Sequence, residues 1–295
     1  MQALLPYTLI LILVMRKITS ISLVVLLLSG LFGGCEKKEN ATPPTLPPAA
    51  TMTMDFSNFA GKKSTSADPD LKSIAAADKS NWIAAAYIAG IWNTILAVNL
   101  AVPVESFKLA VNTTPVYLNG KWEWIYDFNV IGATYKARLT GEIRSGDVKW
   151  EMYISKQGVG AFPELLWFEG TSMPDGKSGQ WILNHSQAFP EPVLQIDWEN
   201  SGSATSNIKY TYIRDKKDDR TTDFFKTSFI EYGVTANPLN AFYNVHQNTG
   251  VQGAFNDVFI EWNTTNHNGH IKANFHFKDD LWHCWNESGD NIICN

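Results

Sequence analysis

The feature that most constrains this chain is an alternation of apolar and polar residues that begins after Pro103 and continues to the C-terminus. Successive side chains of a strand point to opposite faces, so this period is typical of strands with one buried face. Turn-forming residues interrupt the alternation about every 10–15 residues. The pattern predicts a long antiparallel meander whose consecutive strands are joined by hairpins.

Three dipeptides suited to two-residue turns fix a register for the first strands of this meander. They are Asn119-Gly120, Ile131-Gly132 and Ser145-Gly146. The register they predict pairs Phe128–Tyr135, Trp124–Leu139, Trp122–Gly141, Gly141–Trp150, Leu139–Met152 and Ile143–Val148 on one face, and Asp127–Lys136 and Glu142–Lys149 on the other. Apolar residues thus share one face and opposite charges share the other. A slip of one residue would exchange the faces, so this agreement supports the register.

The same reasoning applied to the C-terminus uses Asn268-Gly269 as a further two-residue turn. It predicts the pairs Trp262–Phe275, Ile260–Phe277 and Thr264–Ala273, and a tight turn at Asp279-Asp280 then adds Phe277–Trp282 and Phe275–Cys284. A last turn near Ser288–Asp290 sets Cys284 opposite Cys294. Directly opposed residues are close enough for a disulfide, which we predict here, with two buried thiols as the alternative.

An Ala-rich segment precedes the meander and predicts a helix over residues 69–101. Asp68-Pro69 suits a helix start and Pro103 suits its end. Four polar residues argue against the rival interpretation as a membrane span: Lys79, Asn81, Asn93 and Asn99. We therefore expect a mainly β fold, a long antiparallel up-and-down meander (a curved sheet or partly open barrel) with one N-terminal helix packed on its apolar face. The arrangement looks like that of the half-barrel lipoprotein carriers, which hold acyl chains between sheet and helix, but the likeness is one of architecture alone.

The N-terminus predicts export. Met15-Arg16-Lys17 supplies positive charge, Ile18–Leu28 is apolar, and small residues lead to Cys35. This segment resembles the bacterial lipoprotein signal through its lipobox, Phe32-Gly33-Gly34-Cys35, although Phe32 departs from the usual Leu. The resemblance implies a signal peptide over residues 1–34, with translation starting at Met15, and several acyl chains on Cys35 after cleavage. An uncleaved anchor and an ordinary secretory signal are the alternatives.

Residues 35–67 are rich in Pro, Thr and Ala, and we expect a disordered tether between the lipidated cysteine and a single domain over residues 68–295. The expected location is the bacterial cell envelope, with the membrane as a partner through the N-terminal lipid; the side of the membrane stays open. A formal net charge of −5 argues against nucleic acid as a partner.

Motifs with known chemistry are few. No nucleophile elbow, P-loop or dinucleotide-binding fingerprint occurs, so we predict no catalytic residue and no cofactor. The predicted C-terminal register aligns Glu261, His276 and His283 across adjacent strands, a familiar zinc ligand set, with a chance row on a wet face as the alternative. Outward aromatic residues, one from each of the pairs Trp167/Phe168 and Trp282/Trp285, are candidates for stacking on sugars.

Three functions fit these observations. The first is a non-catalytic module that binds a protein or glycan partner, and it predicts an outward aromatic patch and no internal void. The second is a carrier of a lipid or other apolar ligand, and it predicts a cavity of several hundred Å³ between helix and sheet. The third, a metal-dependent hydrolase, needs the three ligands within about 4 Å of a common point.

Overall fold

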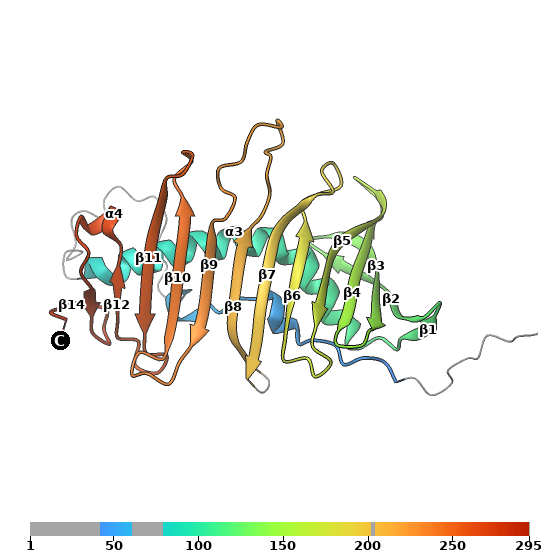
Figure 1. Cartoon of the computed structure of the whole chain (residues 1–295), viewed down its shortest axis with the longest axis horizontal. Helices are drawn as coiled ribbons and strands as arrows, with labels where there is room; N and C mark the ends of the chain where they lie inside the picture. The colour runs from blue at the N-terminus through green and yellow to red at the C-terminus, as the bar shows by residue number, and fades with distance from the viewer. Residues whose placement is uncertain (1–41, 61–78, 202–203, 295) are drawn as a thin grey trace, which may run out of the picture. The chain divides into compact units, whose positions relative to one another are not determined.

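The computed structural model describes residues 42–60, 79–201 and 204–294, and Pro43–Asn295 form one compact unit. The fold is mainly β: fourteen antiparallel strands form one open sheet in which each strand pairs with its neighbours in the sequence (Figure 1). The strands are β1 Val116–Leu118, β2 Lys121–Val130, β3 Ala133–Ile143, β4 Val148–Lys156, β5 Phe162–Ser172, β6 Ser178–Asn184, β7 Pro192–Ser201, β8 Ala204–Tyr212, β9 Phe229–Val234, β10 Ala241–Asn248, β11 Phe255–Trp262, β12 Gly269–Lys272, β13 His283–Trp285 and β14 Asn291–Ile292. The predicted up-and-down meander is confirmed.

The predicted register of the first hairpins is confirmed. β2 and β3 pair Trp124 with Leu139, and β3 and β4 pair Leu139 with Met152. These three side chains are at most 2% exposed, so they lie on one buried face. Asn119 and Ile131 and the glycines that follow them have positive φ angles, as type I′ turns require.

The predicted register of the C-terminal strands is wrong. Trp262 pairs with Gly269 instead of Phe275, and Ile260 pairs with Ile271 instead of Phe277. The connection is a longer loop in which the Asn263 side chain accepts hydrogen bonds from the backbone N–H groups of Thr265 and Asn266. Such local bonds stabilise an Asx-type turn. Gly269 consequently lies inside β12 and does not form the turn.

The tight turn predicted at Asp279-Asp280 is also absent, because a short helix, α4 (Asn274–Phe277), occupies the segment that was expected to be a strand. β13 therefore pairs with β12, where His283 lies opposite Ile271 and Cys284 lies opposite His270.

The long helix α3 spans Ser80–Ala110 and continues through Pro103, which was predicted to end it. Its segments Ser80–Ala97 and Asn99–Ala110 are bent by 61°. Pro103 has no N–H to donate to the Asn99 carbonyl, and a missing bond of this kind is a common cause of a kink. Residues 69–78 of the predicted helix lie outside the described residues.

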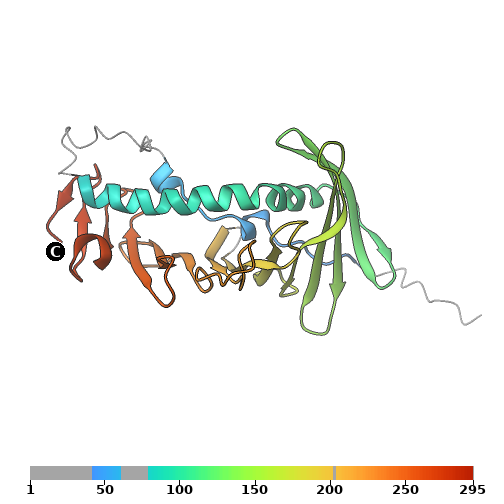
Figure 2. The same cartoon turned by 90° about the horizontal axis from the view of Figure 1, so that it is seen from above.

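α3 contacts strands that lie far apart in the sheet. The Asn81 Nδ2 atom donates to the Cys284 carbonyl at 2.9 Å, and the Phe107 ring lies 5.2 Å from the Trp181 ring. Figure 2 shows the helix crossing the strands on one side of the sheet. Among the described residues no single helix is long and apolar enough to cross a membrane, although the two segments of α3 together satisfy that criterion of length and composition.

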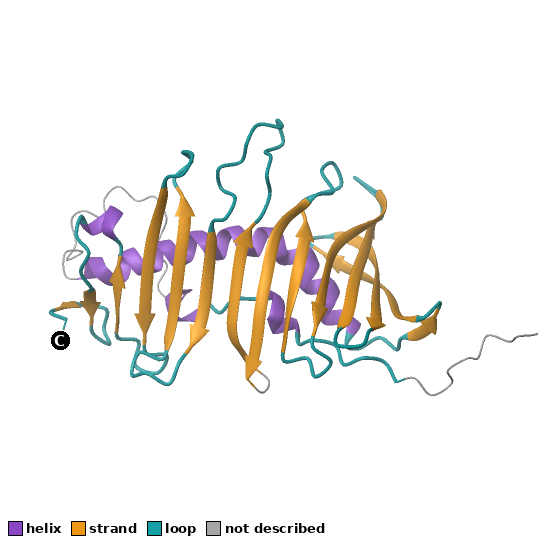
Figure 3. Cartoon of the chain, viewed as in Figure 1, coloured by secondary structure: helices purple, strands orange, loops and turns teal. Residues whose placement is uncertain are grey.

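Residues 42–60 are not a tether, so that part of the predicted linker is wrong. They include a 3₁₀ helix, η1 (Ala49–Met52), and one helical turn, α2 (Ser57–Ala60), both visible in Figure 3. Their buried residues include Thr51, Met52, Met54, Phe56 and Phe59. Met52, Met54 and Phe56 alternate with exposed residues, a short strand-like pattern that the surrounding Pro and Thr residues conceal.

Candidate functional site

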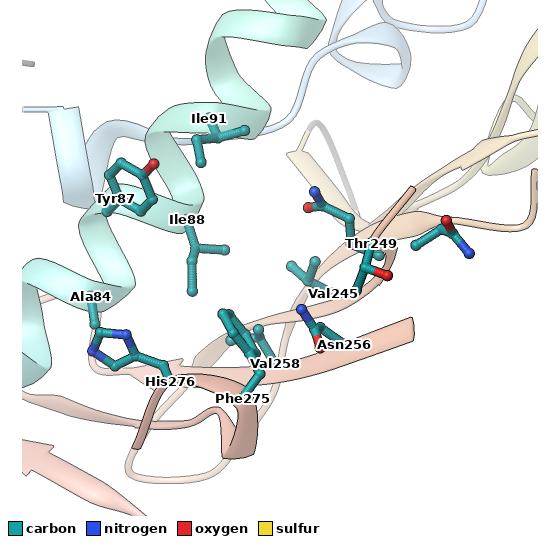
Figure 4. A pocket seen from close by; sticks show the side chains of 12 residues that line it. Ala84, Tyr87, Ile88, Ile91, Val245, Thr249, Asn256, Val258, Phe275 and His276 are labelled. Atoms are coloured by element: carbon teal, nitrogen blue, oxygen red, sulfur yellow. The ribbon is translucent and has the colours of Figure 1, made fainter. Parts of the chain in front are cut away.

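The most apolar of the larger hollows lies between α3 and strands β10 and β11. We name it the α3–β10 hollow (Figure 4), and its volume is about 370 Å³. Its lining residues are Ala84, Tyr87, Ile88, Ile91, Val245, Gln247, Asn248, Thr249, Asn256, Val258, Phe275 and His276. Ligand pockets of proteins commonly have volumes of about 300–1,000 Å³, so this hollow is large enough for a small ligand.

Regular secondary structure explains why its walls are apolar. Ala84, Ile88 and Ile91 are spaced four and three residues apart, so they lie on one face of α3. Val245 and Val258 are direct cross-strand partners of β10 and β11 and are both buried. Ala84 has the smallest side chain of the helical set, which leaves space between the helix and the sheet.

Polar groups also line the hollow. Asn248 is satisfied within the protein, because its Nδ2 donates to the Val251 carbonyl and its Oδ1 accepts from the Gly250 N–H. His276 belongs to α4, and its ring makes edge contacts with Phe275 and Phe277. Within residues 42–60, 79–201 and 204–294 we find no hydrogen-bond or ion-pair partner for this ring. Among the described residues, the His276 ring is thus a polar group of the lining without a hydrogen-bond or ion-pair partner.

Two further hollows adjoin α3. The α3–β6 hollow has a volume of about 200 Å³ and is lined by the helical residues 92–99 together with Trp167, Leu183 and Tyr212. A third hollow of about 350 Å³ lies between α3 and residues 52–56, with Tyr210 in its lining. The α3–β10 hollow and the α3–β6 hollow are lined by successive parts of α3, from Ala84 to Ile91 and from Trp92 to Asn99.

Two phenol groups in these linings, those of Tyr210 and Tyr212, are held neutral by burial. Burial raises the pKa of Tyr212 to about 12, and the hydrogen bond from its hydroxyl to Asp223 Oδ2 at 2.7 Å acts in the same direction. Burial also raises the pKa of the Tyr210 phenol. Both side chains are therefore uncharged at neutral pH, which suits an apolar ligand.

The three residues predicted to bind a metal are not brought together. Glu261 Oε2 contacts His270 Nε2 at 2.8 Å, not His276, because the register differs from the predicted one. His276 lies in α4, and His283 Nε2 contacts Asp279 Oδ1 at 2.9 Å. The described part of the chain contains no group of three or more His, Cys, Asp or Glu residues that could hold a metal ion. The register error thus removes the basis of the predicted zinc site.

The other predicted residues have mixed outcomes. The Cys284–Cys294 disulfide is confirmed, with Cα atoms 5.3 Å apart, although Cys284 pairs directly with Ile292. Phe168 and Trp285 are fully buried, whereas Trp282 is 36% exposed and stacks on His270. The lipid-attachment residue, Cys35, lies outside the described residues.

The chain matches no protein-family model, no curated protein and no solved structure. Sequence reasoning did not find the lining of the hollow. The sequence showed the apolar positions on one face of α3. The opposite side of the hollow is formed by β10 and β11, and the pairing of these strands was not predicted from the sequence.

Proposed function

We propose that this protein is a carrier that binds an apolar ligand of the acyl-chain type in the α3–β10 hollow. The observation that supports this function is the hollow itself, about 370 Å³ in volume and lined by the aliphatic side chains of Ile88, Ile91, Val245 and Val258. Filling such a space with a ligand removes apolar surface from water, at about 25 cal/mol per Å². A binding module without an internal void, the first of the three functions considered from the sequence, does not account for this hollow.

The proposal extends to the arrangement of helix and sheet. We propose that the helix predicted over residues 69–101 covers the apolar face of the sheet. The ligand then enters the part of that face beside α3 that no side chain fills, which is the α3–β10 hollow. Tyr87 lines this hollow with 64% of its surface exposed, so the ligand has an entrance from solvent. The α3–β6 hollow, next along the helix, offers space to a longer chain.

The proposal also includes the cell envelope as the site of action. The lipobox-like segment ending at Cys35 and the preceding apolar run support an exported protein anchored by its own lipid. A membrane-anchored carrier would collect its ligand at a lipid surface, where apolar chains are available.

Filling the hollow with a side chain tests the binding. In the full chain, Ile88→Trp places an indole where the ligand would lie, and we expect at least a tenfold loss of affinity for a fluorescent acyl-chain probe. Ile125→Trp is the matched control, because Ile125 is 48% exposed on β2, away from the hollow. Equal binding by both variants, or no binding by the unmodified chain, would exclude the carrier function.

A further inference from the structure

Another hollow lies outside the sheet, beside α4, and its chemistry differs from that of the α3–β10 hollow. We name it the outer pocket, and its volume is about 380 Å³. Its lining residues are Phe255, Asn256, Asp257, Phe259, Lys272, Asn274, Phe275 and Asp280. Three aromatic rings therefore stand beside amide, carboxylate and ammonium groups.

Both carboxylates of the outer pocket have a partner within the protein: Asp280 forms an ion pair with Lys272, and Asp257 forms a hydrogen bond with His246. Lys272 Nζ lies 2.9 Å from Asp280 Oδ1, and Asp257 Oδ1 lies 2.6 Å from His246 Nδ1. No cation is left without a carboxylate partner in this lining, so an anionic group gains little there. Asn256 and Asn274 offer both donors and acceptors, which suits hydroxyl groups. Phe259, 40% exposed, offers an aromatic surface to the C–H groups of a sugar ring.

The outer pocket and the α3–β10 hollow share part of their lining. Asn256 and Phe275 line both of them, so a single wall separates the apolar space from the polar one. In Figure 4 both side chains project at the edge of the α3–β10 hollow, across from the helix. A ligand with an apolar and a polar part can occupy both spaces by passing over this wall.

We infer that the ligand is a glycolipid-like amphiphile, with its apolar chain in the α3–β10 hollow and a neutral polyhydroxyl head group in the outer pocket. This inference rests on the proposed carrier function and adds the chemistry of the head group. Hydroxyl groups match the amides and paired carboxylates, whereas a phosphate or sulfate would face Asp257 and Asp280.

Two amphiphiles that share a dodecyl chain test the inference on the full chain. We expect dodecyl maltoside to displace a fluorescent acyl-chain probe at concentrations at least tenfold lower than dodecylphosphocholine. The variant Asn274→Ala should remove this preference and leave dodecylphosphocholine binding unchanged. The control is Glu287→Ala, which removes a carboxylate from an exposed residue outside both hollows. Phe259→Ala is a second variant with the same expected effect, in case the first does not fold.

The outcomes separate the two proposals. Equal affinity for the two amphiphiles overturns the head-group inference and leaves the carrier function standing. Free maltose that binds as tightly as dodecyl maltoside overturns the idea of one ligand in both hollows. If neither amphiphile nor the probe binds, the carrier function itself fails, and the head-group inference with it.

Discussion

At the scale of single residues, Glu151 is the centre of a charge cluster on the outer face of the sheet. Its carboxylate lies 3.0 Å from Lys121 Nζ and 2.9 Å from Lys149 Nζ, and its side chain is 13% exposed. Burial alone would raise the pKa of Glu151, but the hydrogen bonds from the two lysines outweigh it and lower the pKa to about 2. The ionised form is therefore stabilised in the folded state.

This shift predicts a dependence of stability on pH. A carboxyl group whose pKa falls from 4.5 to about 2 on folding contributes stability that is present above pH 4.5 and is lost as the pH falls toward 2. We expect Glu151→Gln to lower the free energy of unfolding by about 1–2 kcal/mol at pH 7. The loss should shrink at pH 3, measured by urea unfolding. Glu287→Gln should have little effect at either pH, and an equal loss from Glu151→Gln at both would refute the assignment.

Two glycine residues covered by tryptophan rings, Gly141 and Gly269, show why the predicted register is correct for the first hairpins and wrong for the C-terminal strands. A Cβ on Gly141 would lie 2.8 Å from Trp150, and one on Gly269 would lie 2.5 Å from Trp285. The first pairing was predictable because two tight turns anchor its strands. The second was not, because Asn268-Gly269 has the composition of a turn while the packing of Trp285 requires Gly269 inside a strand.

At the scale of elements, residues 42–60 act as part of the core. The indole N–H of Trp181 donates to Thr51 Oγ1 at 3.1 Å, and Thr205 Oγ1 donates to the Ala50 carbonyl at the same distance. The Phe59 ring makes an edge contact with the Trp262 ring, with centroids 5.2 Å apart. Composition predicted a tether because Pro, Thr, Ala and charged residues dominate residues 35–67, and only contact with the sheet gives the few large apolar side chains a partner.

The hydrogen bond of Thr51 makes this role testable. Thr51→Val keeps the shape of the side chain but leaves the buried indole N–H of Trp181 without its acceptor. We expect a loss of about 1–3 kcal/mol in the free energy of unfolding, measured by urea titration. The matched control is Thr53→Val, because Thr53 is exposed. A free tether would give the same small effect for both substitutions.

The candidate site was less predictable than the sheet. A hollow exists where side chains from separate elements fail to meet, and this depends on the helix, on β10 and β11 and on α4 together. The sequence predicted a strand where α4 forms. It therefore placed His276 in a row of metal ligands, whereas the structure places His276 in the lining of the α3–β10 hollow. Local patterns specify which residues are buried, but they do not specify the space between elements.

At the scale of the whole molecule, α3 connects strands that are far apart in the sheet. Near its start, Asn81 bonds to the backbone of Cys284 in β13, and near its end Phe107 contacts Trp181 in β6. The sheet itself pairs only neighbours in sequence, so its two ends share no strand contacts. The helix, together with residues 42–60, whose Thr51 and Phe59 contact Trp181 and Trp285, therefore makes the folding of distant strands interdependent.

This coupling predicts a single cooperative unfolding transition. Phe107 is fully buried, and Phe107→Ala should cost about 3–5 kcal/mol through the cavity that it leaves. Because α3 joins both ends, amides of β2–β6 and of β11–β13 should lose protection by the same amount in native-state hydrogen exchange. Leu109→Ala, on the same helix but 37% exposed, should change protection little. Loss of protection confined to β2–β6 would mean that the sheet unfolds in two independent parts.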